Sequence, residues 1–132
     1  AISRTWDTID VFYRLDNGNL ADRSMYPEAK WNLREWSIKP TGGISAIARD
    51  SSTIEVMLRE DNFKIKEVWW HSTMAPNWSV NNNISSGVAD AAGDPVVISR
   101  SSDNLEVFYR SKDNILKNIN FSPSGWNIPT TP

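Results

Sequence analysis

The feature that most constrains the fold is a threefold internal repeat. Three segments of 14 residues, 1–14, 46–59 and 97–110, align without a gap and begin 45 and then 51 residues apart. The shared columns are Ile2/Ile47/Ile98, Arg4/Arg49/Arg100, Ile9/Ile54/Leu105, Asp10/Glu55/Glu106, Val11/Val56/Val107 and Arg14/Arg59/Arg110. An Asp-Asn pair, an apolar residue and a closing tryptophan (Trp31, Trp78 or Trp126) follow in every unit. Such a chain folds as repeated supersecondary units.

The periodicity inside each unit is that of β-strands. Ile9, Val11 and Tyr13 alternate with Asp10 and Phe12, which is a period of two residues. The Asp-Asn pair that follows suits a turn, because both side chains tolerate left-handed backbone and cap turns. Further short strands follow the turn, so we expect a four-stranded antiparallel sheet per unit, within the ~40–50-residue range of propeller blades.

Two architectures accommodate three such sheets. A β-trefoil closes with three units in one chain, whereas a β-propeller needs roughly 4–8 blades, so that three blades would be half of a six-bladed ring. The propeller therefore requires a homodimer or another homo-oligomer. The predicted units are 1–43, 44–93 and 94–132, together forming a single repeat domain.

Composition excludes several functions. Lys and Arg number 14 against 16 Asp and Glu, a net charge of -2 that does not suit nucleic-acid binding. No cysteine is present and His71 is the only histidine, so we expect no metal site, no cofactor and no thiol chemistry. No apolar run is long enough to insert into a membrane. No signal peptide is visible, which leaves the localisation open between the cytoplasm and release by another route.

The repeat resembles the blade of bacterial and fungal β-propeller lectins. The matching pattern is an apolar residue and Arg, then an acidic residue with Val-Phe-Tyr-Arg, then Asp-Asn, and a closing Trp. It is similar to Photorhabdus-type and tectonin-like proteins and, secondly, to the six-bladed fucose-binding lectins. The Gln-x-Trp signature of trefoil lectins is absent. The resemblance therefore implies three propeller blades, with the trefoil as the alternative.

The resemblance also implies where a sugar would bind. In the fucose-binding family, sites between blades use a third-strand Glu, a Trp three residues later and a second-strand Arg. The Glu column here holds Asp22, Glu67 and Asn118; the Trp column holds Met25, Trp70 and Phe121; and the Arg column holds Asp10, Glu55 and Glu106. Only the middle unit keeps both Glu and Trp, and the fucose-type arginine is replaced throughout.

Physical chemistry supports a sugar site around the same residues. A sugar ring packs its C–H face on an aromatic plane, while carboxylates and guanidinium groups bind its hydroxyls. Trp69 and Trp70 should face opposite sides of their strand. Trp31, Trp78 and Trp126 are expected mainly to pack between units. The two repeated arginine columns, Arg4/Arg49/Arg100 and Arg14/Arg59/Arg110, are expected to pair with the acidic column. The candidate ligand-binding residues are Glu67, Trp70, Trp69, Arg49, Arg100, Asp22, Trp78 and Trp36.

The leading hypothesis is a multivalent carbohydrate-binding lectin that recognises fucose or a related, possibly modified, sugar between blades. The alternative is a non-catalytic protein-interaction or structural propeller module, in which the tryptophans serve assembly. No nucleophile motif or singled-out carboxylate pair indicates catalysis, so we do not expect an enzyme.

Overall fold

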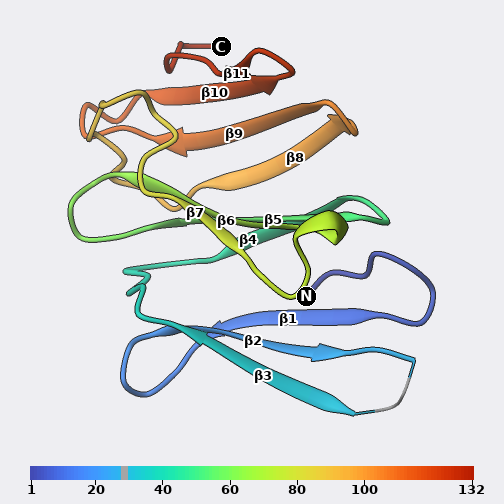
Figure 1. Ribbon diagram of the computed structural model, residues 1–132. Helices are drawn as coiled ribbons and strands as arrows, with labels where there is room; N and C mark the ends of the chain where they lie inside the picture. The colour runs from blue at the N-terminus through green and yellow to red at the C-terminus, as the bar shows by residue number, and fades with distance from the viewer. Residues whose placement is uncertain (28–29) are drawn as a thin grey trace.

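The computed structural model describes residues 1–27 and 30–132, which form three antiparallel sheets in chain order (Figure 1). Blade 1 holds β1 (Ile9–Arg14), β2 (Leu20–Met25) and β3 (Trp31–Trp36). Blade 2 holds β4 (Ser45–Asp50), β5 (Thr53–Arg59), β6 (Ile65–His71) and β7 (Ser79–Asn81), with a short 3-10 helix, η1 (Ser72–Met74). Blade 3 holds β8 (Val96–Ser101), β9 (Asn104–Arg110), β10 (Leu116–Ser122) and β11 (Gly125–Trp126). The prediction of an all-β chain is confirmed.

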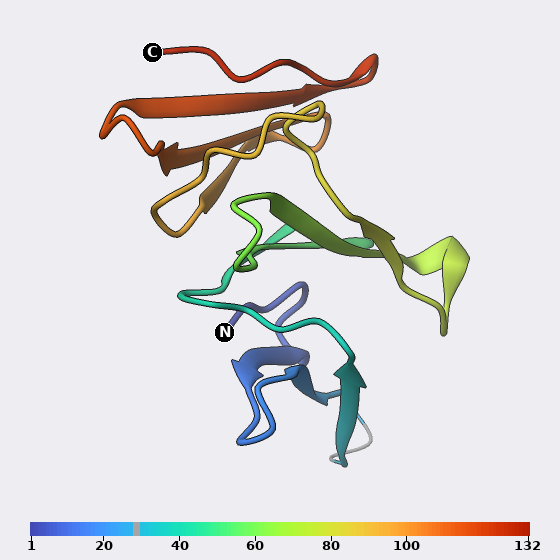
Figure 2. The same ribbon diagram turned by 90° about the vertical axis from the view of Figure 1, so that its left-hand side faces the viewer.

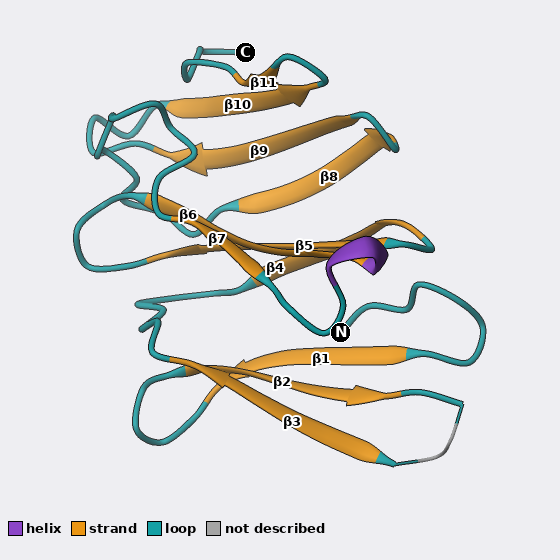
Figure 3. Cartoon of the chain, viewed as in Figure 1, coloured by secondary structure: helices purple, strands orange, loops and turns teal. Residues whose placement is uncertain are grey.

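Each sheet is a meander in which strands adjacent in sequence are hydrogen-bonded neighbours (Figure 3). Within residues 1–27 and 30–132, no strand of one sheet joins the ladder of another. A trefoil closes its repeats into a common barrel, so the trefoil alternative is wrong. Separate meandering sheets are the blades of a β-propeller, and that prediction is confirmed.

The repeat columns coincide with equivalent positions in the ladders. The pairs Ile2↔Asp10, Ile47↔Glu55 and Ile98↔Glu106 occupy the same register in the three blades. Blade 1 differs from the four-strand prediction, because only Ile2 of its first strand pairs with β1. The Thr8 hydroxyl accepts hydrogen bonds from the backbone N–H groups of Arg4 (3.3 Å) and Thr5 (3.1 Å), which bends this segment into a turn and ends the ladder early.

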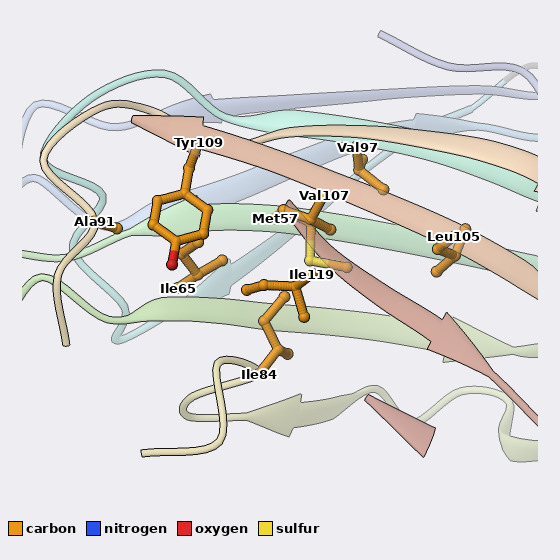
Figure 4. Close-up of a cluster of buried hydrophobic side chains, with 9 residues drawn as sticks. All are labelled: Met57, Ile65, Ile84, Ala91, Val97, Leu105, Val107, Tyr109 and Ile119. Atoms are coloured by element: carbon orange, nitrogen blue, oxygen red, sulfur yellow. The ribbon is translucent and has the colours of Figure 1, made fainter. Parts of the chain in front are cut away.

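The three sheets stack on one another in chain order (Figure 2). Successive side chains of β5 point alternately into the contact with blade 1 and the contact with blade 3. We call the contact between blades 1 and 2 the first seam and that between blades 2 and 3 the second seam. The buried core of the first seam comprises Leu20, Ile38, Ile54, Val56, Leu58 and Val68. That of the second seam comprises Met57, Ile65, Ile84, Ala91, Val97, Leu105, Val107, Tyr109 and Ile119 (Figure 4). Even-numbered β5 side chains therefore face blade 1, and odd-numbered ones face blade 3.

The outer faces of the terminal blades carry exposed apolar side chains. Ile9 on blade 1 is 37% exposed, whereas its repeat equivalents Ile54 and Leu105 are buried in the seams. Leu116 on blade 3 is 56% exposed, although its equivalents Leu20 and Ile65 are fully buried. The middle blade thus has two partners, and each terminal blade has one among the described residues.

In the part of the chain that the structure describes, no helix has the length and apolar character needed to cross a bilayer. The same residues contain no cluster of three or more His, Cys, Asp or Glu side chains suited to a metal ion.

Candidate functional site

An arginine from the first segment of each repeat lies beside the acidic column of the next strand. The Arg4–Asp10, Arg49–Glu55 and Arg100–Glu106 pairs have N–O distances of 3.7, 3.4 and 3.5 Å. The predicted pairing is confirmed for this arginine column. It is wrong for the column of Arg14, Arg59 and Arg110, because Arg59 pairs with Asp94 and Arg110 donates to Asn114 instead. Because Asp10 and Glu55 point toward the following blade, each seam receives one buried ion pair.

The second seam encloses a cavity of about 240 Å³. Blade 2 contributes its polar wall and blade 3 its aromatic wall; the lining residues are Arg49, Glu55, Glu67, Trp69, Asn81, Phe121 and Trp126. The Trp126 Nε1–H donates to Glu67 Oε2 at 3.2 Å, and the Phe121 and Trp126 ring centroids are 5.2 Å apart. The cavity therefore combines acceptors, a cation and aromatic planes.

Two carboxyl groups form the buried floor of this cavity. Glu55 and Glu67 are 3% and 5% exposed and lie diagonally across from each other on β5 and β6, where Glu55 pairs with Trp69 and Met57 with Glu67. Burial, followed by the neighbouring Glu67 charge, raises the pKa of Glu55 to about 9, and burial also raises the pKa of Glu67. Glu55 Oε2 is buried and accepts no hydrogen bond from the described residues. The raised pKa favours a proton on Glu55, which makes this group a hydroxyl donor beside the acceptor oxygens of Glu67.

The first seam encloses a second cavity, of about 340 Å³, lined by Arg4, Tyr26, Arg34, Trp70, Ala75 and Pro76. The Arg4 guanidinium lies 4.6 Å from the Trp70 ring centroid and 5.5 Å from that of Tyr26. Arg34 lies 5.3 Å from the Trp78 centroid. Contacts of this kind hold a guanidinium against ring faces while leaving its edge free to donate.

The carboxyl groups of the first seam lie behind these arginines and do not line the cavity. Asp10 and Asp22 are fully buried, and none of their four carboxyl oxygens accepts a hydrogen bond from the described residues. Burial, followed by repulsion from Asp10, raises the pKa of Asp22 to about 7, and burial raises the pKa of Asp10 as well. The two seams thus share a plan but expose different groups.

The third arginine–carboxyl pair, Arg100–Glu106, lies on the outer face of blade 3. The Arg100 side chain is 70% exposed, and Glu106 accepts from Asn118 at 2.9 Å and from Asn120 at 3.2 Å. The equivalent aromatic wall, around Met25 and Trp31, lies on the outer face of blade 1, where Trp31 is 51% exposed. The outer faces of blades 3 and 1 therefore carry residues equivalent to the polar and the aromatic wall of a seam.

The structure separates two residues that the sequence places in one site. Glu67 faces the second seam, whereas Trp70 faces the first, because residues three apart on a strand point to opposite sides. The grouping of Glu67 with Trp70 is therefore wrong. The predicted opposition of Trp69 and Trp70 is confirmed, and each lines a different cavity.

The other candidates fall at three places. Arg49 lines the second seam, and Arg100 lies on the outer face of blade 3. Asp22 is buried beneath Arg34 in the first seam. Trp36 and Trp78 pack edge to face there, with ring centroids 5.2 Å apart, so Trp78 has the packing role expected of the repeated tryptophans.

Sequence reasoning missed the arginine, amide and aromatic groups of the opposite walls: Arg4, Tyr26, Arg34, Asn81, Phe121 and Trp126 as cavity residues. The repeat columns already align Phe121 with Trp70; strand parity could in addition have shown that both face the preceding blade. Arg34 and Asn81 are equivalent by register, since they pair with Asp22 and Glu67, but no shared sequence pattern marks them.

Two further features lie outside these seams. A larger cavity of about 890 Å³ lies among the loops that join β1 to β2, β3 to β4 and β5 to β6. His71 caps η1, since its Nδ1 accepts from the Thr73 backbone N–H at 3.2 Å. The single histidine thus has a structural partner.

No protein-family model and no curated protein matches the chain. Among solved structures, AofleA from Arthrobotrys oligospora matches with a TM-score of 0.76 and 18% identity, over 98% of this chain and 39% of that one. A fucose lectin from Kordia zhangzhouensis, in complex with methyl-fucoside, matches with a TM-score of 0.70 and 17% identity, over 95% and 92%. A mutant Aleuria aurantia lectin in complex with Fucalpha1-6GlcNAc matches with a TM-score of 0.65 and 22% identity, over 95% and 40%.

The chain shares their fold. It spans about two fifths of the AofleA and Aleuria chains but nearly all of the Kordia chain. Three blades of this kind therefore occur both within a longer chain and as a chain of about this length.

Proposed function

We propose that this protein is a non-catalytic lectin that binds glycans between its blades. The second-seam cavity carries the proposal. It brings the Glu55–Glu67 pair, the Arg49 guanidinium and the Asn81 amide together with aromatic side chains. Hydroxyl groups of a sugar need both donors and acceptors, and its C–H face packs on an aromatic ring. A volume of about 240 Å³ lies below the ~300–1,000 Å³ of drug-sized pockets and suits one sugar ring.

The sugar is fucose or a related, possibly modified, one. Support comes from the fucoside complexes of the Kordia and Aleuria lectins, whose fold this chain shares. Glu67 occupies the column of the fucose-family glutamate. Glu55 replaces the second-strand arginine, and Arg49 brings a guanidinium to the cavity from β4 instead. Similarity to the Photorhabdus-type and tectonin-like proteins stays a prediction.

Binding without catalysis is supported by the geometry of the carboxyl groups. Glycosidases place their two carboxyls roughly 5–9.5 Å apart, on either side of the scissile bond. Glu55 and Glu67 instead lie on adjacent strands at the buried floor of one cavity, so they do not flank a glycosidic bond from opposite sides. His71 is engaged with Thr73 and lines neither seam.

The outer faces of blades 1 and 3 support self-association. Blade 3 presents Arg100, Glu106 and Asn118, and blade 1 presents the exposed Trp31, so a second copy would complete further seams and cover the apolar faces. We propose closure into a ring by two chains. Several weak sites on one ring bind a glycan-coated surface more tightly than one site does.

Titration of intrinsic tryptophan fluorescence with methyl-fucoside and other neutral monosaccharides tests sugar binding. Because Trp69 and Trp126 line the cavity, binding should quench or shift their emission. Glu67→Gln should weaken binding at least tenfold, since a charged acceptor is lost. Glu35→Gln is the matched control, because Glu35 is exposed on β3 and lies outside both seams. Absence of any response across a glycan array would contradict the proposal.

Light scattering tests self-association separately. The wild-type mass should be twice that of the 15.0 kDa chain, and Trp31→Glu should reduce it to one chain. Trp6→Glu is the control, because Trp6 is 96% exposed but lies in the turn before β1. A wild-type monomer would exclude ring closure by a second copy.

A further inference from the structure

The first seam differs from the second in the groups that reach its cavity. Two guanidiniums, Arg4 and Arg34, line the first cavity. One guanidinium and two carboxyl groups, Arg49 with Glu55 and Glu67, line the second. The difference arises at three equivalent positions: aspartates replace the longer glutamates at two of them, and Arg34 stands where the second seam has Asn81.

The short aspartates pair with these arginines only at long range. The nearest N–O distances are 3.7 Å for Arg4–Asp10 and 3.9 Å for Arg34–Asp22, which exceed hydrogen-bond length. Neither guanidinium donates a hydrogen bond to another side chain among residues 1–27 and 30–132, and the buried Arg4 Nε is one of these unpaired donors. A guanidinium has five N–H donors. The Arg34 side chain is 35% exposed and offers its donors to a ligand, whereas the Arg4 side chain is 9% exposed and its Nε faces Asp10.

Burial limits the negative charge behind the arginines. Asp10 and Asp22 lie next to each other without donors, and the pKa of both is raised by burial. Two arginines therefore face fewer than two full negative charges in mildly acidic solution. The cavity side, lined by the guanidiniums and by Tyr26 and Trp70, is positive.

The aromatic rings hold the two guanidiniums in place. Arg4 lies over Trp70 and Tyr26, and Arg34 lies over Trp36 and Trp78. One face of Trp70 is therefore covered by a cation and does not serve as a platform for a neutral sugar. Planar guanidiniums fixed in this way suit bidentate recognition of a carboxylate or a sulfate.

From these contacts we propose that the first seam binds a saccharide that carries an anionic group, with Arg4 and Arg34 as its anion-binding residues. This inference rests on the proposed lectin function. It assigns the two seams different ligands: a neutral sugar in the second and an acidic sugar in the first. The cavity of about 340 Å³ is the larger of the two, as an added charged substituent requires.

Tryptophan indole NMR separates the two seams, because each contains its own reporters. Trp70 and Trp78 lie in the first seam, and Trp69 and Trp126 in the second. The probes are methyl-fucoside, glucuronic acid, a sulfated monosaccharide and inorganic sulfate. We expect the acidic sugars to shift the Trp70 and Trp78 signals, and the neutral one to shift those of Trp69 and Trp126.

The decisive variant is Arg34→Asn, which gives the first seam the residue found in the second. It should weaken the acidic sugar at least tenfold and leave methyl-fucoside binding unchanged. Arg34→Lys keeps the charge but loses the planar fork, and should lie between the two. Arg23→Asn is the matched control, because Arg23 is exposed on the adjacent strand β2 and points away from the seam.

Each result decides a separate point. A shift of the Trp70 and Trp78 signals with glucuronic acid alone, or with the sulfated sugar alone, supports the proposal and identifies which anionic group the first seam binds. Three results would overturn the proposal. The first is that inorganic sulfate binds as tightly as the sulfated sugar; the second is that acidic sugars shift the Trp69 and Trp126 signals; the third is that Arg34→Asn binds acidic sugars as the wild type does. Methyl-fucoside shifts without any first-seam response would overturn the inference and leave the lectin function standing. No response to any sugar would remove both.

Discussion

The first and second seams are built from the same repeat columns yet present opposite chemistry. In the second seam, glutamates reach the cavity, and the Trp126 indole holds one of them at 3.2 Å. In the first seam the aspartates stop short of the cavity, and the arginines line it. Two aspartates in place of glutamates, each one methylene group shorter, and one strand-edge difference, Arg34 for Asn81, therefore change which charge a ligand would meet, while both seams keep a buried apolar core.

The largest expected effects test that shared packing. Met57 faces the second seam and Leu58 the first, and both are fully buried. Met57→Ala and Leu58→Ala should each lower the free energy of unfolding by about 2–5 kcal/mol, because each leaves a cavity. Urea denaturation measures both. A loss below about 1 kcal/mol at either position would show that its seam is loosely packed.

The next effect distinguishes two equivalent tryptophans. Trp126 donates to the buried Glu67, whereas the Trp78 Nε1 has no partner among the described residues. Trp126→Phe should cost about 1.5–3 kcal/mol more than Trp78→Phe, since a hydrogen bond to a charged group is lost only in the second seam. Thermal or chemical denaturation of the two variants gives the comparison. Equal costs would mean that the indole–carboxylate contact contributes no stability.

The first seam should also make stability depend on pH. Asp22 has a raised pKa of about 7 in the folded protein against the ordinary 3.8, so the folded state retains a proton that the unfolded chain releases between these values. The free energy of unfolding should therefore fall as pH rises from about 4 to about 7, by at most about 1.4 kcal/mol per pH unit for this group. Asp10, Arg4 and Arg34 are the charged groups around it.

Asp22→Asn removes this ionisation and keeps the shape of the side chain. Its stability should vary less with pH than that of the wild type over the same interval, as measured by urea denaturation at successive pH values. Asp16→Asn, in the exposed β1–β2 turn, is the control. Identical pH profiles for the wild type and Asp22→Asn would contradict a buried, protonated Asp22.

The smallest effect compares a seam with an outer face. Arg100 is the repeat equivalent of Arg49, but its side chain is 70% exposed and its partner Glu106 has two amide donors besides. In the Trp31→Glu background, which should prevent self-association, Arg100→Ala should change stability by about 0–1 kcal/mol, because exposed ion pairs contribute little. Arg49→Ala should cost more in the same background, since it leaves Glu55 buried without its cation. Near-equal losses in that background would contradict the difference in exposure between the two arginines.

The sequence predicts much of the fold because the same strand and turn pattern occurs three times, so each strand can be located by comparing the three units. Strand alternation places Asp10 and Phe12 on one side of β1, and the turn residues separate the strands as expected. The first strand of blade 1 is the exception. There the Thr8 hydroxyl competes with the ladder for backbone donors, a local effect that the aligned columns do not reveal.

The candidate site is less predictable, since its walls come from different blades. Sequence proximity suggests that Glu67 and Trp70 act together, although strand geometry sends them into separate seams. Phe121 and Trp126 meet Glu67 only after blades 2 and 3 have packed. Arg34 approaches Asp22 through cross-strand pairing.

The sequence by itself determined the repeating unit, its strands, the Arg–carboxyl pairs and the absence of cysteine and of multi-histidine chemistry. These follow from residue type and periodicity within one unit. Only the tertiary structure decided which residues share a cavity, because stacking joins the polar wall of one blade to the aromatic wall of the next. It also decided which charges are exposed, since the depth of each carboxyl beneath the seam depends on side-chain length relative to a packed neighbour.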